Sequence, residues 1–356
     1  MKVGVLGCGV ISRNYAENAA AFDSFELVAC ADLDRAAAEA LAADHGLAAV
    51  GVEELVADPA IDLVLNLTPP AVHAAVNGNL LGAGKHVYSE KPLAATAAEA
   101  AALLAEAERR GLRIGCAPDT FLSAAVQTAR TLIDEGAIGE PLSVSAAMLL
   151  GGPTSWHPNP DIFFADGAGP LLDMGPYYLT AIVALLGPVR RVSAFAATRT
   201  VEHEIAIGPR AGERFRSHMP THTASVLELA DGVSGSLLAS FEASGQYAYD
   251  LTIYGTEATL SLPDPNSFDT GLRVRRAPKP WETVPVASRG PQDARGLGLD
   301  DLVRAIGEGR AHRASGTLAH HVVDIARTIL AAAEAGRTLE LGTTVERPDV
   351  LPPPSS

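Results

Sequence analysis

The chain has 356 residues and a formal net charge of −15; 47% of its residues are hydrophobic, 19% charged and 5% aromatic. This composition is typical of a folded globular protein, and the length is sufficient for two domains. The negative charge argues against nucleic acid and against an anionic membrane surface as partners, because both would repel the chain.

The sequence predicts a cytoplasmic protein with no membrane span and no metal site. No apolar run reaches the roughly 18 residues of a spanning helix. The segment Met1 to Gly7 is typical of a strand that enters a turn, and it lacks the apolar core of a signal peptide. Cys8, Cys30 and Cys116 do not have the spacing of metal ligands and indicate reduced thiols in a reducing compartment.

Short apolar runs alternate with helical stretches up to about residue 120. Strands are predicted at Lys2–Leu6, Glu26–Ala31, Ile61–Leu67, His86–Ser89 and Arg113–Cys116, and helices at Ser12–Ala21, Ala36–Asp44, Ala71–Leu81 and Thr96–Arg110. Thr96 and Glu99 form a capping-box pattern at the start of the last helix. The alternation predicts that residues 1–120 form a domain with a doubly wound, parallel sheet.

The pattern changes in residues 121–356, which we expect to form a second, α+β domain. Helices are predicted at Ala124–Glu135, Met174–Leu186, Asp300–Glu308 and Thr317–Ala335, and strands at Leu142–Leu149, Val189–Ala197, Thr223–Leu229, Val233–Ser240, Tyr249–Tyr254 and Ala258–Leu262. Ala230-Asp231-Gly232 is typical of a hairpin turn between two of these strands. Consecutive strands with tight turns predict a mostly antiparallel sheet.

The first predicted strand ends in a turn typical of dinucleotide-binding domains, Gly7-Cys8-Gly9-Val10-Ile11-Ser12. Gly7 permits the tight turn, and Gly9 lets the backbone approach a pyrophosphate. The N–H groups at the start of the following helix would then stabilise the phosphate charge. Ser12 stands where such turns have a third glycine, and it is small enough for close packing.

Asp32 ends the second predicted strand, where a carboxylate accepts hydrogen bonds from the ribose hydroxyls of an adenosine. The same carboxylate would repel a 2′-phosphate, which favours NAD over NADP. Arg35 keeps NADP open, because an arginine there accommodates that phosphate. The alternative interpretation of Asp32 is a helix N-cap, a role that Asp34 fits equally well.

Four polar or glycine positions follow carboxyl ends of predicted parallel strands: Gly7, Asp32, Thr68 and Lys91. Such positions line one rim of a doubly wound sheet, where ligands bind. Lys91 is one of only four lysines, and beside a nicotinamide it would lose hydration, which lowers the pKa of the ammonium and suits proton transfer. Pro92 would fix this loop, with a cis bond as one way to do so. The alternative is an ordinary surface lysine.

Together these residues resemble the Gfo/Idh/MocA family, which includes glucose–fructose oxidoreductase and inositol dehydrogenase. The resemblance covers nearly the whole chain. It rests on the motifs Gly7 to Ser12, Thr68-Pro69 with His73, Glu90-Lys91-Pro92 and Gly169 to Gly175. It implies a Rossmann domain and a second domain with a large open antiparallel sheet, whose exposed face joins subunits into a homo-dimer or homo-tetramer. It also implies hydride transfer between NAD(P) and a carbinol carbon of a sugar, cyclitol or related polyol.

Carried over from the family, Lys91 matches the catalytic lysine, Asp173 a substrate-binding aspartate, and Glu90 a position near the cofactor ribose. Thr68, Pro69 and His73 match the other cofactor-side motif. The family usually has a histidine base four residues after the aspartate, but this chain has Tyr177 there. A phenol beside a cation exchanges a proton, so we expect Lys91 and Tyr177 to act as a pair. The alternative is that Tyr177 only packs or holds a sugar hydroxyl.

The loop before Asp173 contains Trp156 and His157 between residues that constrain the backbone. An indole ring suits stacking on a sugar, and His157 is a second candidate for the base; a plain surface loop is the alternative. Three functions remain open at this point. They are a dehydrogenase that releases NADH, an enzyme that keeps its NAD through a transient keto-sugar step in epimerisation or elimination, and an NAD-binding regulator without enzymatic activity.

Overall fold

The structure is a computed structural model that describes residues 1–245, 247–286 and 295–352. Contacts between Cα atoms divide the chain into two compact units. Unit 1 comprises Met1–Ser123 and the described part of residues 288–323. Unit 2 comprises the described part of residues 124–287 and residues 324–352. The chain therefore returns to unit 1 after passing through most of unit 2, which the alternating pattern of residues 1–120 does not indicate.

Unit 1 contains a six-stranded sheet in the order β3-β2-β1-β4-β5-β6, with every pair parallel. The strands are β1 (Lys2–Leu6), β2 (Glu26–Ala31), β3 (Ala48–Ala49), β4 (Leu63–Asn66), β5 (His86–Ser89) and β6 (Ile114–Cys116). The order of strands reverses between β1 and β4, and the carboxyl ends of both strands lie at this switch point. The predicted doubly wound sheet of a Rossmann domain is confirmed.

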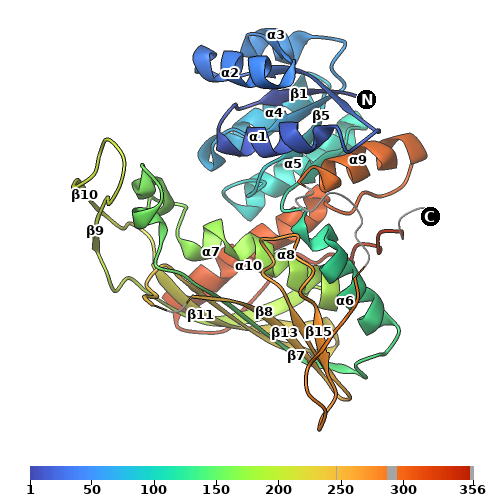
Figure 1. Ribbon diagram of the computed structural model, residues 1–356, viewed down its shortest axis with the longest axis vertical. Coiled ribbons are helices and arrows are strands. Elements are labelled where there is room, and N and C mark those ends of the chain that lie inside the picture. Colours follow the sequence, from blue (N-terminus) through green and yellow to red (C-terminus); the bar gives the residue numbers. More distant parts are fainter. Residues whose placement is uncertain (246, 287–294, 353–356) are drawn as a thin grey trace. The chain divides into compact units, whose positions relative to one another are not determined.

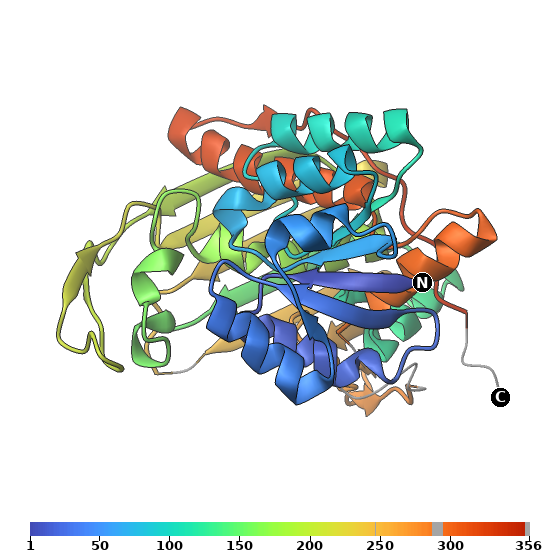
Figure 2. The same ribbon diagram turned by 90° about the horizontal axis from the view of Figure 1, so that it is seen from above.

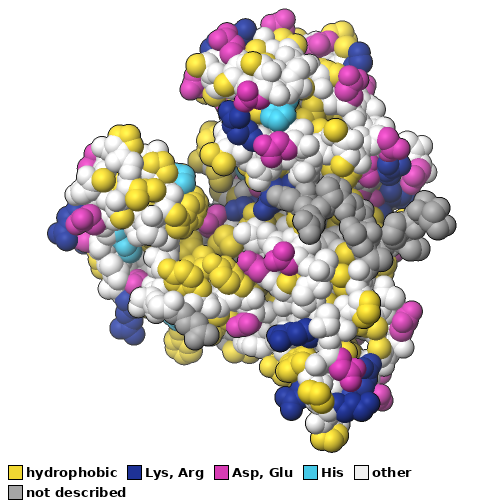
Figure 3. Space-filling view, in the orientation of Figure 1, with side chains coloured by type: hydrophobic (Ala, Val, Ile, Leu, Met, Phe, Trp, Pro, Cys, Tyr) yellow, Lys and Arg dark blue, Asp and Glu magenta, His cyan; other side chains and the backbone are white. Residues whose placement is uncertain are grey.

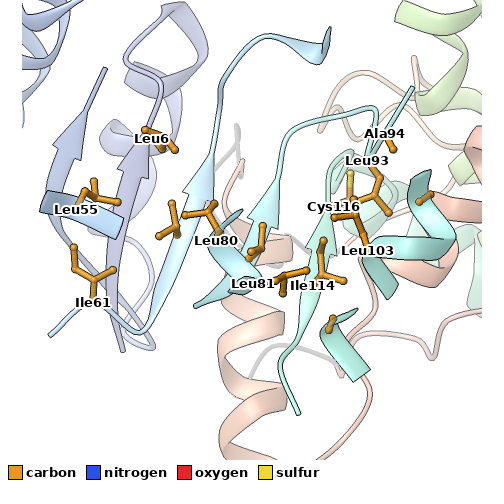
Figure 4. Packing of buried hydrophobic residues seen from close by; sticks show 14 of the residues in the cluster. Leu6, Leu55, Ile61, Leu80, Leu81, Leu93, Ala94, Leu103, Ile114 and Cys116 are labelled. Carbon is orange, nitrogen blue, oxygen red and sulfur yellow. The ribbon is translucent and has the colours of Figure 1, made fainter. Parts of the chain in front are cut away.

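Helices cover both faces of this sheet, with α1 and α2 on one side and α4 and α5 on the other (Figure 2). The helices of unit 1 are α1 (Val10–Ala19), α2 (Arg35–His45), α3 (Val52–Ala57), α4 (His73–Gly82), α5 (Ala97–Arg110) and α9 (Leu297–Glu308). Leu55, Leu80, Leu81 and Leu103 pack from α3, α4 and α5 against buried strand residues in one apolar cluster (Figure 4). Burial of these side chains fixes the positions of the strands whose carboxyl ends form the rim.

The start of α5 agrees with a local sequence signal. The Thr96 hydroxyl accepts a hydrogen bond from the Glu99 N–H at 3.2 Å, and the Glu99 carboxylate accepts one from the Thr96 N–H at 2.9 Å. The predicted capping box of α5 is therefore confirmed. β3 and α3 have only two and six residues and were not predicted.

Unit 2 is built on a nine-stranded sheet in the order β16-β15-β14-β13-β7-β12-β11-β8-β17. Its strands are β7 (Pro141–Leu149), β8 (Val189–Ala197), β11 (His222–Leu229), β12 (Ser234–Ser240), β13 (Ala248–Gly255), β14 (Thr259–Leu262), β15 (Arg273–Arg275), β16 (Glu282–Thr283) and β17 (Leu339–Glu340). Among these strands of the described residues, only β7 and β12 pair in parallel. The mostly antiparallel second sheet is confirmed, and so is the turn between β11 and β12, where Asp231 and Gly232 have φ values of 62° and 79°.

Helices cover one face of this sheet (Figure 1). They are α6 (Ala124–Asp134), α7 (Pro170–Asp173), α8 (Gly175–Leu186) and α10 (Gly316–Ala335), the last of which begins in unit 1. Along β8, β11 and β13, buried residues largely alternate with residues that are partly or fully exposed. Phe195 is 82% and Val226 59% exposed on this second face. Within the described residues, no helix is long and apolar enough to span a membrane.

Candidate functional site

The glycine turn after β1 has the conformation that a dinucleotide requires. Gly7 has a φ of +99°, and a Cβ at this position would lie 2.6 Å from the carbonyl carbon of Leu67, so only glycine fits. Apart from Gly9 itself and its neighbours in the chain, no described atom lies within 4 Å of the place where a Cβ of Gly9 would be. Gly9 is also the N-cap of α1 and has no side chain to occupy the first N–H groups of the helix. The turn is thus open to a pyrophosphate.

The rest of the turn divides into an inner and an outer side. Ser12 is fully buried, and its hydroxyl donates a hydrogen bond to the Gly9 carbonyl at 2.6 Å, which supports the turn from inside. Ile11 is half-buried, whereas Val10 is 86% exposed. Sequence reasoning missed two further exposed apolar residues, Leu33 (96%) directly after Asp32 and Val72 (43%) after β4.

The Asp32 carboxylate ties the end of β2 to the glycine turn. It accepts a hydrogen bond from the Cys8 N–H at 2.7 Å and another from the Asp34 N–H at 2.8 Å. The N-cap of α2 is Asp34, whose carboxylate accepts from the N–H groups of the first turn, so the structure does not use Asp32 as the helix cap. The Arg35 guanidinium donates hydrogen bonds to the Glu39 carboxylate at 3.0 Å and to the Ala49 carbonyl at 3.1 Å.

The loops after β4 and β5 are joined by a buried polar network that starts at Asn66. The Asn66 carbonyl accepts the Glu90 N–H at 2.8 Å, and its side-chain oxygen accepts from the Thr68 hydroxyl at 2.7 Å. The Asn66 amide donates to Asn77 on α4 at 2.8 Å, and Asn77 in turn donates to the Ser89 hydroxyl and to the Leu93 carbonyl. Thr68 is half-buried and Pro69 is exposed at the surface of this network.

His73, at the start of α4, is fully buried. Its Nδ1 lies 2.6 Å from the Pro92 carbonyl and its Nε2 lies 2.6 Å from the Thr68 carbonyl. The ring therefore faces two loop carbonyls, and direct contact with a ligand would require it to leave both.

Glu90 and Lys91 follow β5 on the same rim. Glu90 is 9% exposed; one carboxylate oxygen accepts from the Tyr15 hydroxyl at 3.2 Å and the other from the Lys91 N–H at 3.0 Å. Lys91 is half-buried, and the Lys91–Pro92 peptide bond is cis, as considered from the sequence. Burial raises the pKa of the neighbouring Cys116 thiol, Glu90 raises it further and Lys91 lowers it. The side chains of Glu90, Lys91 and Cys116 are thus close enough to influence one another's charge.

A buried carboxyl group that sequence reasoning missed lies behind this loop. Asp119 is fully buried, and its Oδ2 accepts hydrogen bonds from the N–H groups of Gly296 and Gly298, at 3.0 and 3.1 Å, where α9 begins. Burial raises the pKa of Asp119, while Arg295 and the two N–H groups act in the opposite direction. Within the described part of the chain, Asp119 Oδ1 and the hydroxyl of buried Tyr88 have no hydrogen-bond partner.

In unit 2, Asp173 and Tyr177 lie on either side of the junction between α7 and α8. Asp173 ends α7 and is half-buried, and Tyr177 lies in the first turn of α8 and is 7% exposed. The next residue, Tyr178, is fully buried and donates a hydrogen bond to Asp264 at 3.3 Å. Burial and Asp264 raise the pKa of Tyr178, so that phenol stays protonated.

Trp156 and His157 belong to an aromatic group in the loop before α7. The ring centroids of His157 and Phe163 are 5.0 Å apart, and those of Trp156 and Phe163 are 5.8 Å apart. Trp156 remains 60% exposed. His157 Nδ1 accepts the Asn159 N–H at 3.0 Å, so in the neutral ring the proton is on Nε2, which then acts as a donor.

A two-stranded hairpin of β9 (Glu202–Glu204) and β10 (Arg214–Arg216) supports this loop and was not predicted. Its Arg210 donates to Asn159 and Asp161 at 3.2 and 3.0 Å, and the Ala206 N–H donates to the Thr154 carbonyl. Rings of the hairpin and the loop pack together, with His203 4.3 Å from Phe164 between centroids. Figure 3 shows apolar side chains gathered on this part of unit 2.

Comparison with known proteins agrees with this arrangement. Residues 1–117 match the model of an oxidoreductase family with an NAD-binding Rossmann fold, and residues 126–261 match the GFO/IDH/MocA C-terminal domain. The chain is 33% identical over 288 residues to dTDP-3,4-didehydro-2,6-dideoxy-alpha-D-glucose 3-reductase of Streptomyces violaceoruber, with 78% of each chain covered. The chain belongs to the Gfo/Idh/MocA family.

Other members are more distant in sequence but cover most of both chains. Trans-1,2-dihydrobenzene-1,2-diol dehydrogenase of Bos taurus is 28% identical over 84% of this chain and 85% of its own. Inositol 2-dehydrogenase of Ralstonia nicotianae is 25% identical over 78% of each chain. Among solved structures, an NAD-binding oxidoreductase from Klebsiella pneumoniae (24% identity, TM-score 0.84, 96% and 98% covered) shares the fold. Levoglucosan dehydrogenase in complex with NADH shares it as well, with 23% identity, a TM-score of 0.83, and 96% of this chain and 99% of its own covered.

The family and the open glycine turn together make this protein an NAD(P)-dependent oxidoreductase that acts on CH–OH groups. Unit 1 brings together the predicted cofactor residues Gly7, Gly9, Asp32 and Thr68 with Glu90 and Lys91 on one rim, as expected for ends of neighbouring parallel strands. Unit 2 contains Trp156, His157, Asp173 and Tyr177. The described residues contain no group of three or more side chains that could hold a metal ion.

Proposed function

We propose that the protein is an NAD-dependent dehydrogenase for a secondary alcohol of a sugar, cyclitol or related polyol. The observation that carries the proposal is the Glu90-Lys91-Pro92 loop, which lies on the same rim of the sheet as the open glycine turn. Relatives named for a deoxyglucose derivative, for inositol and for a dihydrobenzene diol support this class of substrate.

NAD is the proposed cofactor, with NADP less favoured. Gly7, Gly9 and the first N–H groups of α1 would hold the pyrophosphate, with Val10 and Ile11 beside it. The Asp32 carboxylate is fixed at the end of β2 and would repel a 2′-phosphate. Arg35, the candidate partner for such a phosphate, already contacts Glu39 and Ala49. When bound, the nicotinamide exchanges a hydride with the carbinol carbon.

The proposed proton transfer uses Lys91 and Tyr177. The Lys91 amine takes up the proton of the substrate hydroxyl during oxidation and returns it during reduction. Tyr177 takes the place of the histidine usual in the family and shares this proton, while Asp173 binds neighbouring hydroxyls. The burial of Tyr177 to 7% exposure fits a phenol that works in a site with little water.

Trp156 and His157 are proposed to bind the substrate. The exposed indole of Trp156 offers a flat apolar surface for a sugar ring. His157 fits a hydrogen-bond donor to a hydroxyl better than a base, because its Nδ1 lone pair is already used by the Asn159 N–H.

Subunit association through the exposed face of the nine-stranded sheet is also proposed, giving a homo-dimer or homo-tetramer. Phe195 and Val226 are exposed there, and their cross-strand partners are Ala224 and Ser193. Such small neighbours allow a second sheet to approach closely. The buried free thiols of Cys8, Cys30 and Cys116 fit the reducing, cytoplasmic setting that we propose.

The test is a screen of sugars and cyclitols with NAD and NADP, followed by absorbance of the reduced nicotinamide. We expect net NADH formation with at least one polyol. Lys91→Ala should reduce turnover of that polyol by about 10²- to 10⁴-fold while NADH still binds. Lys279→Ala, at an exposed lysine of unit 2, is the control and should leave turnover unchanged.

The other two functions correspond to other outcomes of the same screen. Tightly retained NAD with conversion of a sugar but no net NADH would support epimerisation or elimination through a transient ketone. Cofactor binding without chemistry on any polyol would support a regulator and contradict the proposed dehydrogenase.

A further inference from the structure

His73 is a buried ionisable side chain that the proposed mechanism does not use. It is fully buried at the first position of α4, and each of its two ring nitrogens lies 2.6 Å from a backbone carbonyl oxygen. One carbonyl belongs to Thr68 in the loop after β4, and the other belongs to Pro92 in the loop after β5. The ring thus bridges two loops that emerge from neighbouring strands of the rim.

The number of protons on the ring follows from these two contacts. A carbonyl oxygen only accepts hydrogen bonds, whereas a neutral imidazole has one N–H donor and one acceptor nitrogen. In a neutral ring, one nitrogen lone pair would face an oxygen lone pair at 2.6 Å, which is repulsive because this distance is shorter than an ordinary N–H···O hydrogen bond. Only the doubly protonated ring donates to both oxygens.

The surroundings of the ring are compatible with one positive charge. α4 and the loop after β4 contain no other charged side chain, and the loop after β5 contributes Glu90 and Lys91. Burial of a charge is costly unless it is hydrogen-bonded, and hydrogen bonds from a charged donor are roughly twice as strong as neutral ones. Two such bonds, with the adjacent amides of Asn66 and Asn77 that join the same loops, form a satisfied polar network.

We propose that His73 carries both ring protons and acts as a clamp that positions Lys91. Its bond to the Pro92 carbonyl holds the residue directly after Lys91, and its bond to the Thr68 carbonyl fixes that point against the loop after β4. His73 is thus a positioning residue, whereas the sequence motif alone assigned it to the cofactor. The part of this proposal that concerns turnover rests on the proposed dehydrogenase function; the protonation state does not.

The first experiment measures the ring protons directly in the full-length protein. Histidine is labelled with ¹⁵N, and long-range ¹H–¹⁵N correlation at neutral pH is recorded without cofactor or substrate. We expect both nitrogens of His73 to carry a proton. His86 is the internal reference, because its Nδ1 accepts the Arg113 N–H at 2.9 Å and burial lowers the pKa of this ring. One unprotonated nitrogen on His73 would overturn the proposal whatever the enzyme does.

The second experiment compares His73→Gln with His86→Gln, the matched control in the same unit; loss of one set of signals in each variant also assigns the spectrum. We expect His73→Gln to lower kcat by about 10- to 100-fold, because small errors in the position of a catalytic group have effects of this size. NADH affinity and the KM for the polyol should change little. A His73→Gln protein that keeps kcat but loses NADH would show a cofactor contact and contradict the clamp. If the wild type oxidises no polyol, the dehydrogenase proposal fails while the nitrogen spectrum still decides the clamp.

Discussion

At the scale of single residues, the adjacent tyrosines Tyr177 and Tyr178 have different roles. Tyr177 and Tyr178 lie in the first turn of α8, but the Tyr178 hydroxyl is engaged by Asp264 and its pKa is raised by burial. Tyr177 stands where the family resemblance implies a histidine. The contact with Asp264 marks Tyr178 as a structural phenol, and the family motif makes Tyr177 the proposed candidate for proton transfer.

This difference leads to a paired prediction. Tyr177→Phe should lower kcat by about 10²- to 10⁴-fold, because it removes a group proposed to exchange the substrate proton. Tyr178→Phe should keep kcat and lose about 1 kcal/mol of unfolding free energy, the usual value of one hydrogen bond. Kinetics across pH and chemical denaturation measure the two effects. Nearly full turnover of Tyr177→Phe at every pH would remove its catalytic role.

At the scale of secondary-structure elements, Asp119 links the end of β6 to the start of α9 through two N–H groups from residues far along the chain. Neither the composition nor the spacing around Asp119 marks it as buried. Its partners, Gly296 and Gly298, come about 180 residues later, so only the folded chain shows that a carboxyl group caps this helix.

The burial of Asp119 predicts how stability depends on pH. Because its pKa is raised in the folded state, the folded protein binds the proton more tightly than the unfolded chain. The group therefore favours folding most below its ordinary value of 3.8, and this contribution is lost as pH rises through the higher, folded-state pKa. Asp119→Asn keeps an oxygen acceptor for both N–H groups and cannot ionise.

We therefore expect the unfolding free energy of the wild type to fall relative to Asp119→Asn as pH rises from below 3.8, and then to become parallel to it. Denaturation at a series of pH values, followed by circular dichroism, measures this difference. Asp34→Asn, at the exposed cap of α2, is a control for changing an acid to an amide at a helix start. A constant difference between wild type and Asp119→Asn would contradict the raised pKa.

At the scale of the whole molecule, the exposed face of the second sheet is the proposed contact between subunits. Phe195→Asp combined with Val226→Asp should shift the protein to a smaller assembly, because charges placed in an apolar interface are desolvated. Sedimentation and light scattering measure the mass. Ile162→Asp, at an apolar residue in the loop before α7 that is about as exposed as Val226, should leave the assembly intact. An unchanged mass of the double variant would exclude this face as the interface.

Much of the fold was predictable because its main elements have strong local patterns. The bounds of β1, β2, β5 and β8 agree with the sequence at both ends, since each is a clear apolar or alternating run. β9 and β10 were missed because Glu202–Glu204 and Arg214–Arg216 are mostly charged and have too few apolar residues to show a strand pattern. These strands are positioned by aromatic packing of His203 and Phe215 on Phe164, a contact between segments that are distant in the sequence.

For the candidate site, only the location of the rim residues was predictable. The rim residues follow from strand ends and from the glycine turn, and the family follows from their motifs. The roles of Asn66, Asn77 and Asp119 depend on tertiary hydrogen bonds and had no local signal. His73 shows the limit well, because its motif associates it with the cofactor and only its two carbonyl contacts indicate a different task.

The late return of α9 to unit 1 has a consequence for biosynthesis. The ribosome makes roughly 185 further residues after Ser123 before Glu308, the last residue of α9, is available. At about 5–20 residues per second, this takes on the order of 10 to 40 seconds. During that interval the nascent nucleotide-binding half has its six strands but lacks its last helix, and the Asp119 carboxylate has neither of its backbone donors.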